Sequence, residues 1–315
     1  MLEVFNTLGP VFLIILAGVL LRKFNFFTDQ TISDLKRLAY WVGLPCYLFI
    51  ELSEGYEMTT EAVNMLEILV IASTAAIVLL YIVAKFMRFE TWRIGTFVQL
   101  GFRGNIAYVG LPVVFFAFMG ATNNHQAANY AQKLAALGLG AMVVFYNTLS
   151  VIFLLTSRHG LKKSAIPIVI RQIFSNPLLV STFLGIAWSL TGTSVPQPLP
   201  RAFQLVGKLA LPVALLCVGG SLITTPIKGN IIAPALSSII KTFICPLIGF
   251  GIAIWLGADP IGARVAIILL AVPTSVGSFV LTSQLSGDTH MASAGVVLST
   301  LLSLISLALA VALTS

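Results

Sequence analysis

The sequence predicts an all-helical integral membrane protein with about ten transmembrane helices. Of its 315 residues, 58% are hydrophobic and 9% are charged, whereas a soluble domain carries about a quarter charged residues. The apolar residues form runs of helical membrane-spanning length and lack the period-two alternation of outer-membrane barrel strands. In such a chain the net charge of +7 bears on orientation in the bilayer and does not indicate a nucleic-acid partner.

Ten apolar stretches are long enough to cross a bilayer as helices. The first has no basic segment before it and no small-residue cleavage site after it, so it is interpreted as a span and not as a signal peptide. Connections are short, and the longest is also the most basic. The predicted spans are 4–22, 34–52, 64–86, 94–120, 133–156, 176–192, 202–223, 230–256, 262–285 and 290–313.

Lysine and arginine are distributed unequally between the two sides of these spans. One side holds Arg22, Lys23, Lys36, Arg37, Lys85, Arg88, Arg93, Arg158, Lys162, Lys163, Arg171 and Lys228. The other holds Lys133, Arg201 and Arg264. Because basic loops stay in the cytoplasm, both termini are predicted on the non-cytoplasmic side of a cytoplasmic (inner) membrane.

Two spans share an unusual arrangement, in which a proline follows an arginine by nine residues. One runs from Arg103 to Pro112 and the other from Arg264 to Pro273. Each half of the chain has five spans, an odd number, so a duplication would place the halves in opposite orientations. The matched prolines therefore favour inverted repeats, although transmembrane helices also tolerate proline by chance.

The predicted organisation has three parts. Residues 1–156 form the first five-helix repeat, and residues 176–315 form the second, inverted one. A basic cytoplasmic linker, 157–175, joins them.

The two prolines predict broken helices, since proline lacks the N–H that a helix needs. Pro112 and Pro273 are each expected at the start of a second half-helix, a position that suits proline. The start of a helix has unpaired N–H groups and a partial positive charge. If the two breaks meet near the bilayer midplane, they predict an anion site, most simply for a carboxylate.

The residues near these breaks supply candidate substrate contacts. The amide of Asn105 is expected to donate to a carboxylate, with helix–helix hydrogen bonding as the alternative. Lys241 lies too deep in its span to reach water easily, so it is a candidate for coupling or charge compensation, or equally a structural prop. Arg103 and Arg264 are expected near span entrances. The predicted substrate-binding set is Asn105, Gly110, Pro112, Asn147, Pro273, Thr274, Ser275 and Ser278.

Motifs for catalysis or for metal binding are not found in the sequence. It has no nucleophile elbow, zinc-protease motif or phosphate loop. Its three cysteines lie in apolar runs, and its three histidines are far apart, so neither type has metal-ligand spacing. The protein is therefore expected to be no enzyme and to need no cofactor or metal.

Several motifs resemble the auxin efflux carrier family, which includes bacterial malate and malonate permeases. The stretch from Asn105 to Pro112 is similar to the family's fourth-span motif, and Ala271–Leu281 with Gly287-Asp288 is similar to its ninth-span region. Smaller likenesses are Asn176-Pro177, Gly219–Leu222 and Lys241 before Pro246. The short central loop is like that of the bacterial members, so auxin itself is an uncertain substrate.

The resemblance implies the fold of bile-acid symporters and sodium/proton antiporters. Spans one, two, six and seven would form a dimerising scaffold, and spans three to five and eight to ten a mobile transport domain. Spans four and nine would cross at Pro112 and Pro273, where Asn105 and the adjacent backbone would hold the substrate carboxylate. Movement would follow an elevator mechanism, with the lipid bilayer and a second copy of the chain as partners.

The predicted function is secondary transport of small organic anions such as malate, malonate or auxin-like acids. The sequence leaves open whether transport is coupled to protons or is a uniport driven by the membrane potential. It also leaves open whether the substrate is imported or exported. One alternative is a sodium-coupled organic anion symporter of the bile-acid type, which would need acidic side chains that spans four and nine lack. Another is a membrane sensor that binds a ligand without moving it.

Overall fold

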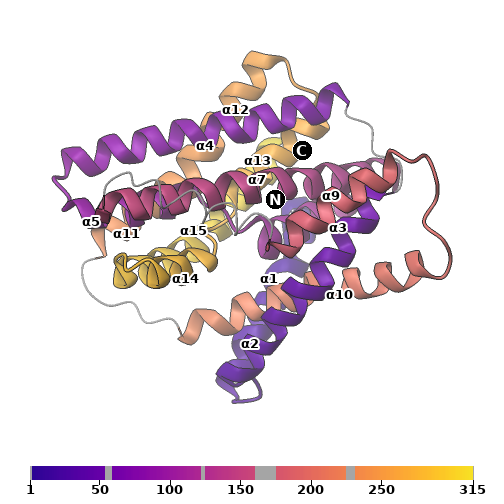
Figure 1. Cartoon of the computed structure of the whole chain (residues 1–315), viewed down its shortest axis with the longest axis horizontal. Coiled ribbons are helices and arrows are strands. Elements are labelled where there is room, and N and C mark those ends of the chain that lie inside the picture. The colour runs from indigo at the N-terminus through magenta and orange to yellow at the C-terminus, as the bar shows by residue number, and fades with distance from the viewer. Residues whose placement is uncertain (1, 54–58, 122–124, 160–174, 225–230, 315) are drawn as a thin grey trace. The chain divides into compact units, whose positions relative to one another are not determined.

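The part of the chain that the structure describes consists of helices joined by short non-helical segments (Figure 1). The computed structural model describes residues 2–53, 59–121, 125–159, 175–224 and 231–314. Within these ranges there is no strand, and one isolated β-bridge occurs. Most of the predicted basic linker 157–175 lies outside the described residues.

Among the described residues each predicted span is largely helical, which confirms an all-helical membrane protein, while the number of about ten transmembrane helices stays a prediction. Within the described ranges, five helical stretches are long and apolar enough to cross a membrane: Thr60–Phe86, Gln126–Ser157, Leu199–Leu222, Ile232–Leu256 and Thr289–Thr314. Shorter apolar helices cover Ile106–Met119, Pro177–Ser189 and Pro260–Ala271. These helices are shorter than the predicted spans, because some spans are broken and others end in loops.

The chain divides into two compact units, and each takes segments from both halves of the sequence. The first comprises Met1–Val63, Ala107–Val143 and Phe174–Thr224, and the second comprises Asn64–Ile106, Val144–Ile173 and Thr225–Ser315. The proposed repeats 1–156 and 176–315 concern sequence symmetry and stay a prediction.

The helices of the first unit are α1 (Leu2–Lys23), α2 (Asp29–Leu38), η1 (Ala39–Gly43), α3 (Leu44–Ser53), α6 (Leu111–Ala121), α9 (Pro177–Ser189) and α10 (Leu199–Thr224). The second unit contains α5 (Thr91–Phe102), α11 (Ile232–Ile239), η3 (Ile240–Ile244), α12 (Cys245–Leu256), α13 (Pro260–Ala271), α14 (Gly277–Gln284) and α15 (Thr289–Thr314). The division falls within α4 (Thr60–Phe86), η2 (Ile106–Gly110) and α7 (His125–His159).

Glycines allow the helices of the first unit to approach closely. α1 packs along α10, and α3 packs on α9 and α10. A Cβ atom added to Gly18 would lie 2.2 Å from the Leu216 carbonyl oxygen, and one added to Gly219 would lie 1.9 Å from that of Ile15. Small residues are the usual means by which membrane helices bring their backbones together, because van der Waals packing drives their association.

The second unit is organised around α13, which is buried on nearly all sides. Its residues Arg264–Ala271 are all buried, a distribution typical of a helix in the middle of a bundle. α12 and α15 pack against α13, while α11 packs against α15 and α5. The carboxyl end of α13, where the helix breaks, therefore lies in the interior of the second unit.

Capping residues explain where two of the shorter helices begin. The Asn176 side chain accepts a hydrogen bond from the Leu178 N–H at 3.0 Å, ahead of α9. The Asp259 carboxylate accepts from Ile261 and Gly262 at 2.9 and 3.1 Å, ahead of α13. In both helices proline follows the capping residue, where its missing N–H costs nothing.

Three spans contain a π-helical turn immediately before a proline. The turns are η1, η2 and η3, and each ends two residues before its proline, which is Pro45, Pro112 or Pro246. A proline ring collides with the carbonyl one turn earlier in a regular α-helix. The wider π-turn relieves this collision, so these spans pass their prolines without ending there.

Candidate functional site

Two helices of the second unit stop inside predicted spans. α5 ends at Phe102, and Arg103 is extended, with φ −77° and ψ 92°. α13 ends at Ala271, and Val272 is extended, with φ −63° and ψ 152°. The non-helical residues are 103–105 in one case and 272–276 in the other, and we call them the paired breaks.

The paired breaks satisfy each other's backbone groups. The Asn105 N–H donates to the Pro273 carbonyl at 2.8 Å, and the Ser275 N–H donates to the Arg103 carbonyl at 2.9 Å. Gly104 and Thr274 therefore face each other in an antiparallel bridge. Non-helical backbone at membrane depth needs such partners, because lipid supplies none. The predicted meeting of two broken helices is thus present within one compact unit.

The two prolines do not mark the breaks in the predicted way. Pro112 is the second residue of α6 and follows η2 without interruption, so the break in span four lies earlier, at residues 103–105. The π-turn explains this, because it accommodates the proline within a continuous helix. Pro273 lies inside its break, and the next helix begins only at Gly277. The expectation that both prolines open a half-helix is wrong for Pro273.

The start of α14 is less open than predicted. The Gly277 N–H donates to the Ser275 hydroxyl at 3.2 Å. The N–H groups of Ser278 and Phe279 donate to the carbonyls of Ser275 and Val276, at 2.9 and 3.1 Å. These local turns use N–H groups that were expected to face a ligand. The partial positive charge of the helix end remains.

Lys241 lies directly behind the bridge. Its side chain is fully buried, and its ammonium group donates to the carbonyl of Leu270, in the last turn of α13. A Cβ atom on Gly104 would lie 3.3 Å from Cε and 3.4 Å from Nζ of Lys241. Lys241 thus caps a carbonyl freed by the break. This contact is the one expected of a structural prop, and a role in coupling stays a prediction.

Thr274 anchors the second break to its neighbours. Its hydroxyl donates to the Leu100 carbonyl at 2.6 Å, and its N–H donates to the Ser299 hydroxyl at 3.0 Å. The Ser306 hydroxyl, also on α15, donates to the Ala271 carbonyl at 3.0 Å. The predicted site residue Thr274 is therefore buried within the protein framework, where it holds the bridge in place.

Arg103 belongs to the paired breaks and not to a span entrance, which corrects the sequence-based expectation. Its Nη2 donates to the Asn147 side-chain oxygen at 2.7 Å. The same Nη2 lies 3.2 Å from the position that a Cβ on Gly277 would take. The structure thus brings Arg103, Asn147 and the first turn of α14 together. The signal available in the sequence was that Arg103 stands two residues before Asn105.

Three other predicted residues are divided between the two compact units. Asn105 is 3% exposed and lies at the end of the first break, immediately before η2. Gly110 ends η2, and with Pro112 it belongs to the first unit. The predicted set is therefore brought together only in part.

Gln99 is a buried polar residue that the sequence analysis missed. Its Nε2 donates to the Ser278 carbonyl at 2.9 Å and to the Thr282 hydroxyl at 2.7 Å, which joins α5 to α14. The Ser278 hydroxyl is fully buried and has no hydrogen-bond partner among the described residues. The only signal for Gln99 in the sequence was that it is a polar residue within an apolar stretch.

We expect Gln99→Met to lower the free energy of unfolding by about 1–3 kcal/mol, because the buried Ser278 carbonyl loses its donor. Thermal unfolding in detergent measures the effect. Gln284→Met is the matched control, since Gln284 is an exposed glutamine of α14, the helix that Gln99 contacts. Equal melting temperatures for the two variants would contradict the prediction.

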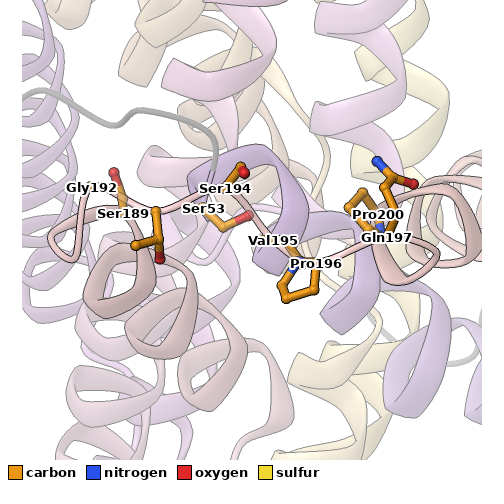
Figure 2. Close-up of a pocket in the computed structure, with 9 residues that line it drawn as sticks. Ser53, Ser189, Gly192, Ser194, Val195, Pro196, Gln197 and Pro200 are labelled. Carbon is orange, nitrogen blue, oxygen red and sulfur yellow. The ribbon is translucent and has the colours of Figure 1, made fainter.

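A separate pocket lies in the first unit, where α9 is connected to α10 (Figure 2). Its volume is about 430 Å³. It is lined by Ser53, Ser189, Gly192, Thr193, Ser194, Val195, Pro196, Gln197 and Pro200. None of these lining residues is charged, so the pocket offers no countercharge for an anion.

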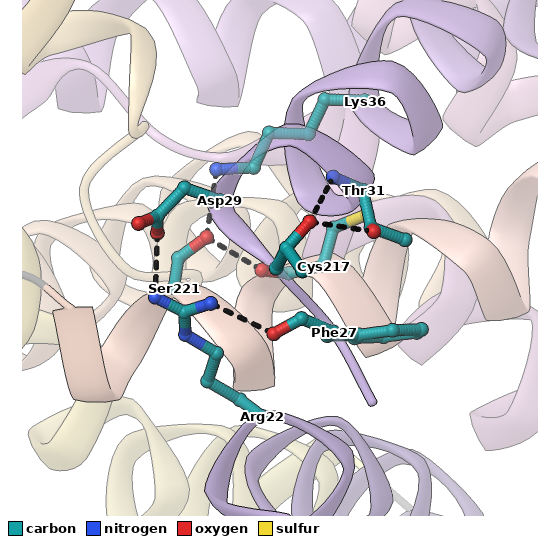
Figure 3. A network of polar contacts seen from close by, with 8 residues as sticks. Arg22, Phe27, Asp29, Thr31, Lys36, Cys217 and Ser221 are labelled. Atoms are coloured by element: carbon teal, nitrogen blue, oxygen red, sulfur yellow. Dashed lines mark hydrogen bonds and ion pairs between the residues drawn. The ribbon is translucent and has the colours of Figure 1, made fainter. Parts of the chain in front are cut away.

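A polar network in the first unit attaches α2 to its neighbours (Figure 3). The Lys36 ammonium group donates to the Ser221 hydroxyl at 2.7 Å, and this hydroxyl donates to the Cys217 carbonyl at 2.6 Å. Arg22 forms an ion pair with Asp29 at 2.7 Å and donates to the Phe27 carbonyl at 2.7 Å. These contacts fasten helix ends and the connection between α1 and α2, which is a structural role.

An all-helical fold with long apolar helices and paired breaks defines the class as an integral membrane protein. The sequence matches the membrane transport protein family over residues 3–311, and the chain belongs to this family, that of the auxin efflux carriers. This confirms the resemblance found in the motifs. The chain is also 25% identical to a Rhizobium meliloti (strain 1021) protein named "Putative malonate transporter", with 96% of this chain and 93% of the relative aligned.

Proposed function

We propose that the protein is a secondary transporter of small organic anions, and that a carboxylate binds beside the paired breaks. The observation that carries this proposal is the polar bridge between two broken helices, with Arg103 and Lys241 next to it. The segments 91–121 and 260–287 contain no aspartate or glutamate. A site with basic and amide groups and no acid favours an anion over a cation.

The side-chain amide of Asn105 is the proposed donor to the carboxylate. It stands at the entry to η2, whose first N–H groups lack intrahelical acceptors as at any helix start. From the other break and the first turn of α14, Ser275 and Ser278 contribute hydroxyl groups, while the Pro273 carbonyl holds the Asn105 N–H in the bridge. Asn147 contributes by holding Arg103, and Thr274 contributes by holding the bridge. Substrate contacts of Gly110 and Pro112 stay predictions.

The transport mechanism we propose is an elevator movement in a homodimer. Spans one, two, six and seven would form the scaffold, and spans three to five and eight to ten would carry the substrate. The basic side would face the cytoplasm of the cell, with both termini outside the inner membrane. The coupling ion we propose is a proton, since a sodium site of the bile-acid type would need acidic side chains that segments 91–121 and 260–287 lack.

We expect Asn105→Ala to reduce saturable malonate uptake into proteoliposomes at least tenfold, because a hydrogen bond to a charged group is worth about 1.5–3 kcal/mol. Malate and indole-3-acetate are tested alongside, under imposed potential, pH and sodium gradients. Asn64→Ala, in the first turns of α4, is the control that should leave uptake unchanged.

The same experiment separates the competing functions. If Asn105→Ala takes up the acid as well as wild type does, Asn105 does not bind the substrate. Uptake that depends on sodium would favour the symporter of bile-acid type. Tight binding of an acid without any uptake would favour a membrane sensor over a transporter.

A further inference from the structure

We infer that Arg103 binds a second carboxylate and so selects dicarboxylates over monocarboxylates. This inference rests on the proposed function, because it takes Asn105 as the donor to the first carboxylate. Arg103 itself was not among the predicted substrate contacts. Its position at the paired breaks is a property of the tertiary structure.

The bridge geometry places the side chains of Arg103 and Asn105 on the same side of the chain. In extended backbone, successive side chains point to opposite sides. The Cβ direction of Gly104 leads to Val272 and Lys241, so residues 103 and 105 point the other way. Alternate residues of an extended chain are roughly 6.6 Å apart. The two side chains therefore start from neighbouring points on one side of the chain, from which they can contact the two ends of one dicarboxylate.

The surroundings of the guanidinium favour an anion. Its Nη2 lies against Gly277, the first residue of α14, and the start of a helix carries a partial positive charge. Two positive groups held together inside a membrane protein are stabilised by a negative charge between them. The buried hydroxyl of Ser278, in the same helical turn, has no partner among the described residues and supplies a further donor.

Asn147 orients the arginine for this task. It accepts from Nη2 at 2.7 Å, and a guanidinium carries five N–H donors in a planar fork. The bond to Asn147 uses one of these donors and fixes the plane of the fork, and carboxylate binding by arginine is frequently bidentate. Lysine at position 103 would keep the positive charge but could not bind a carboxylate through two parallel N–H donors.

The test compares malonate with malonamate, which has the same shape and one carboxylate fewer. Each compound competes with radiolabelled malonate for uptake into proteoliposomes at neutral pH. We expect wild type to prefer malonate by about 10- to 100-fold. In Arg103→Gln this ratio should approach one, with the affinity for malonamate retained. Arg201→Gln, an exposed arginine of α10, should keep the wild-type ratio.

A second variant covers a failure of Arg103→Gln to fold. Gly277→Ala places a Cβ 3.2 Å from Nη2, which displaces the guanidinium while keeping its charge, and it should lower the ratio severalfold. A ratio that stays at the wild-type value in the folded variants, or that is already close to one in wild type, would overturn the role of Arg103. If wild type takes up no carboxylate at all, the proposed function itself is wrong.

Discussion

Gly219→Ala is expected to destabilise the protein by about 3 kcal/mol or more, at the upper end of the usual cost of overpacking. The added methyl group would lie 1.9 Å from the Ile15 carbonyl oxygen. This obstacle is backbone, so no side-chain rotation relieves it. α1 and α10 would have to separate, and the contact around Gly18 would be lost with the one around Gly219.

Thermal unfolding of the purified protein in detergent measures this effect. Gly251→Ala is the matched control, because an added Cβ at Gly251 has no neighbour within 4 Å and alanine favours a helix over glycine. The control should melt at or above the wild-type temperature. Similar melting temperatures for Gly219→Ala and wild type would show that α1 and α10 do not pack as described.

Lys241→Met is the second variant with a large expected effect, and we expect it to abolish uptake as well as to reduce stability. Methionine replaces the unbranched stem of lysine but lacks its terminal ammonium group, so it cannot donate to the Leu270 carbonyl. A buried carbonyl without a donor costs about 1–3 kcal/mol. The bridge at Gly104 packs on the same side chain, so the paired breaks would lose their support.

Lys208→Met separates this effect from the general loss of a positive charge, since Lys208 is an exposed lysine of α10. Uptake and melting temperature are measured for both variants. Lys241→Met with lower stability but normal uptake would restrict Lys241 to a structural role. Normal values for both properties would contradict the contact itself.

Much of the candidate site could be predicted because its signals are local. Asn105 and Lys241 are polar residues in apolar stretches, and Pro273 marks a place where a helix cannot continue. Arg103 and Gln99 were missed as site residues, although Gln99 is also a polar residue in an apolar stretch. Their importance depends on contacts with Asn147, Gly277 and Ser278, which are distant in sequence.

The sequence by itself determined that the chain is a membrane protein, where its helices run and which family it belongs to. Hydropathy, capping residues and motif order are properties of neighbouring residues, and they require no knowledge of packing. Only the tertiary structure decided where span four breaks and what its backbone bonds to. A π-turn carries the chain past Pro112, and Gly104 pairs with Thr274. The physical reason is that backbone groups freed inside a membrane must find partners, and those partners are set by packing between distant segments.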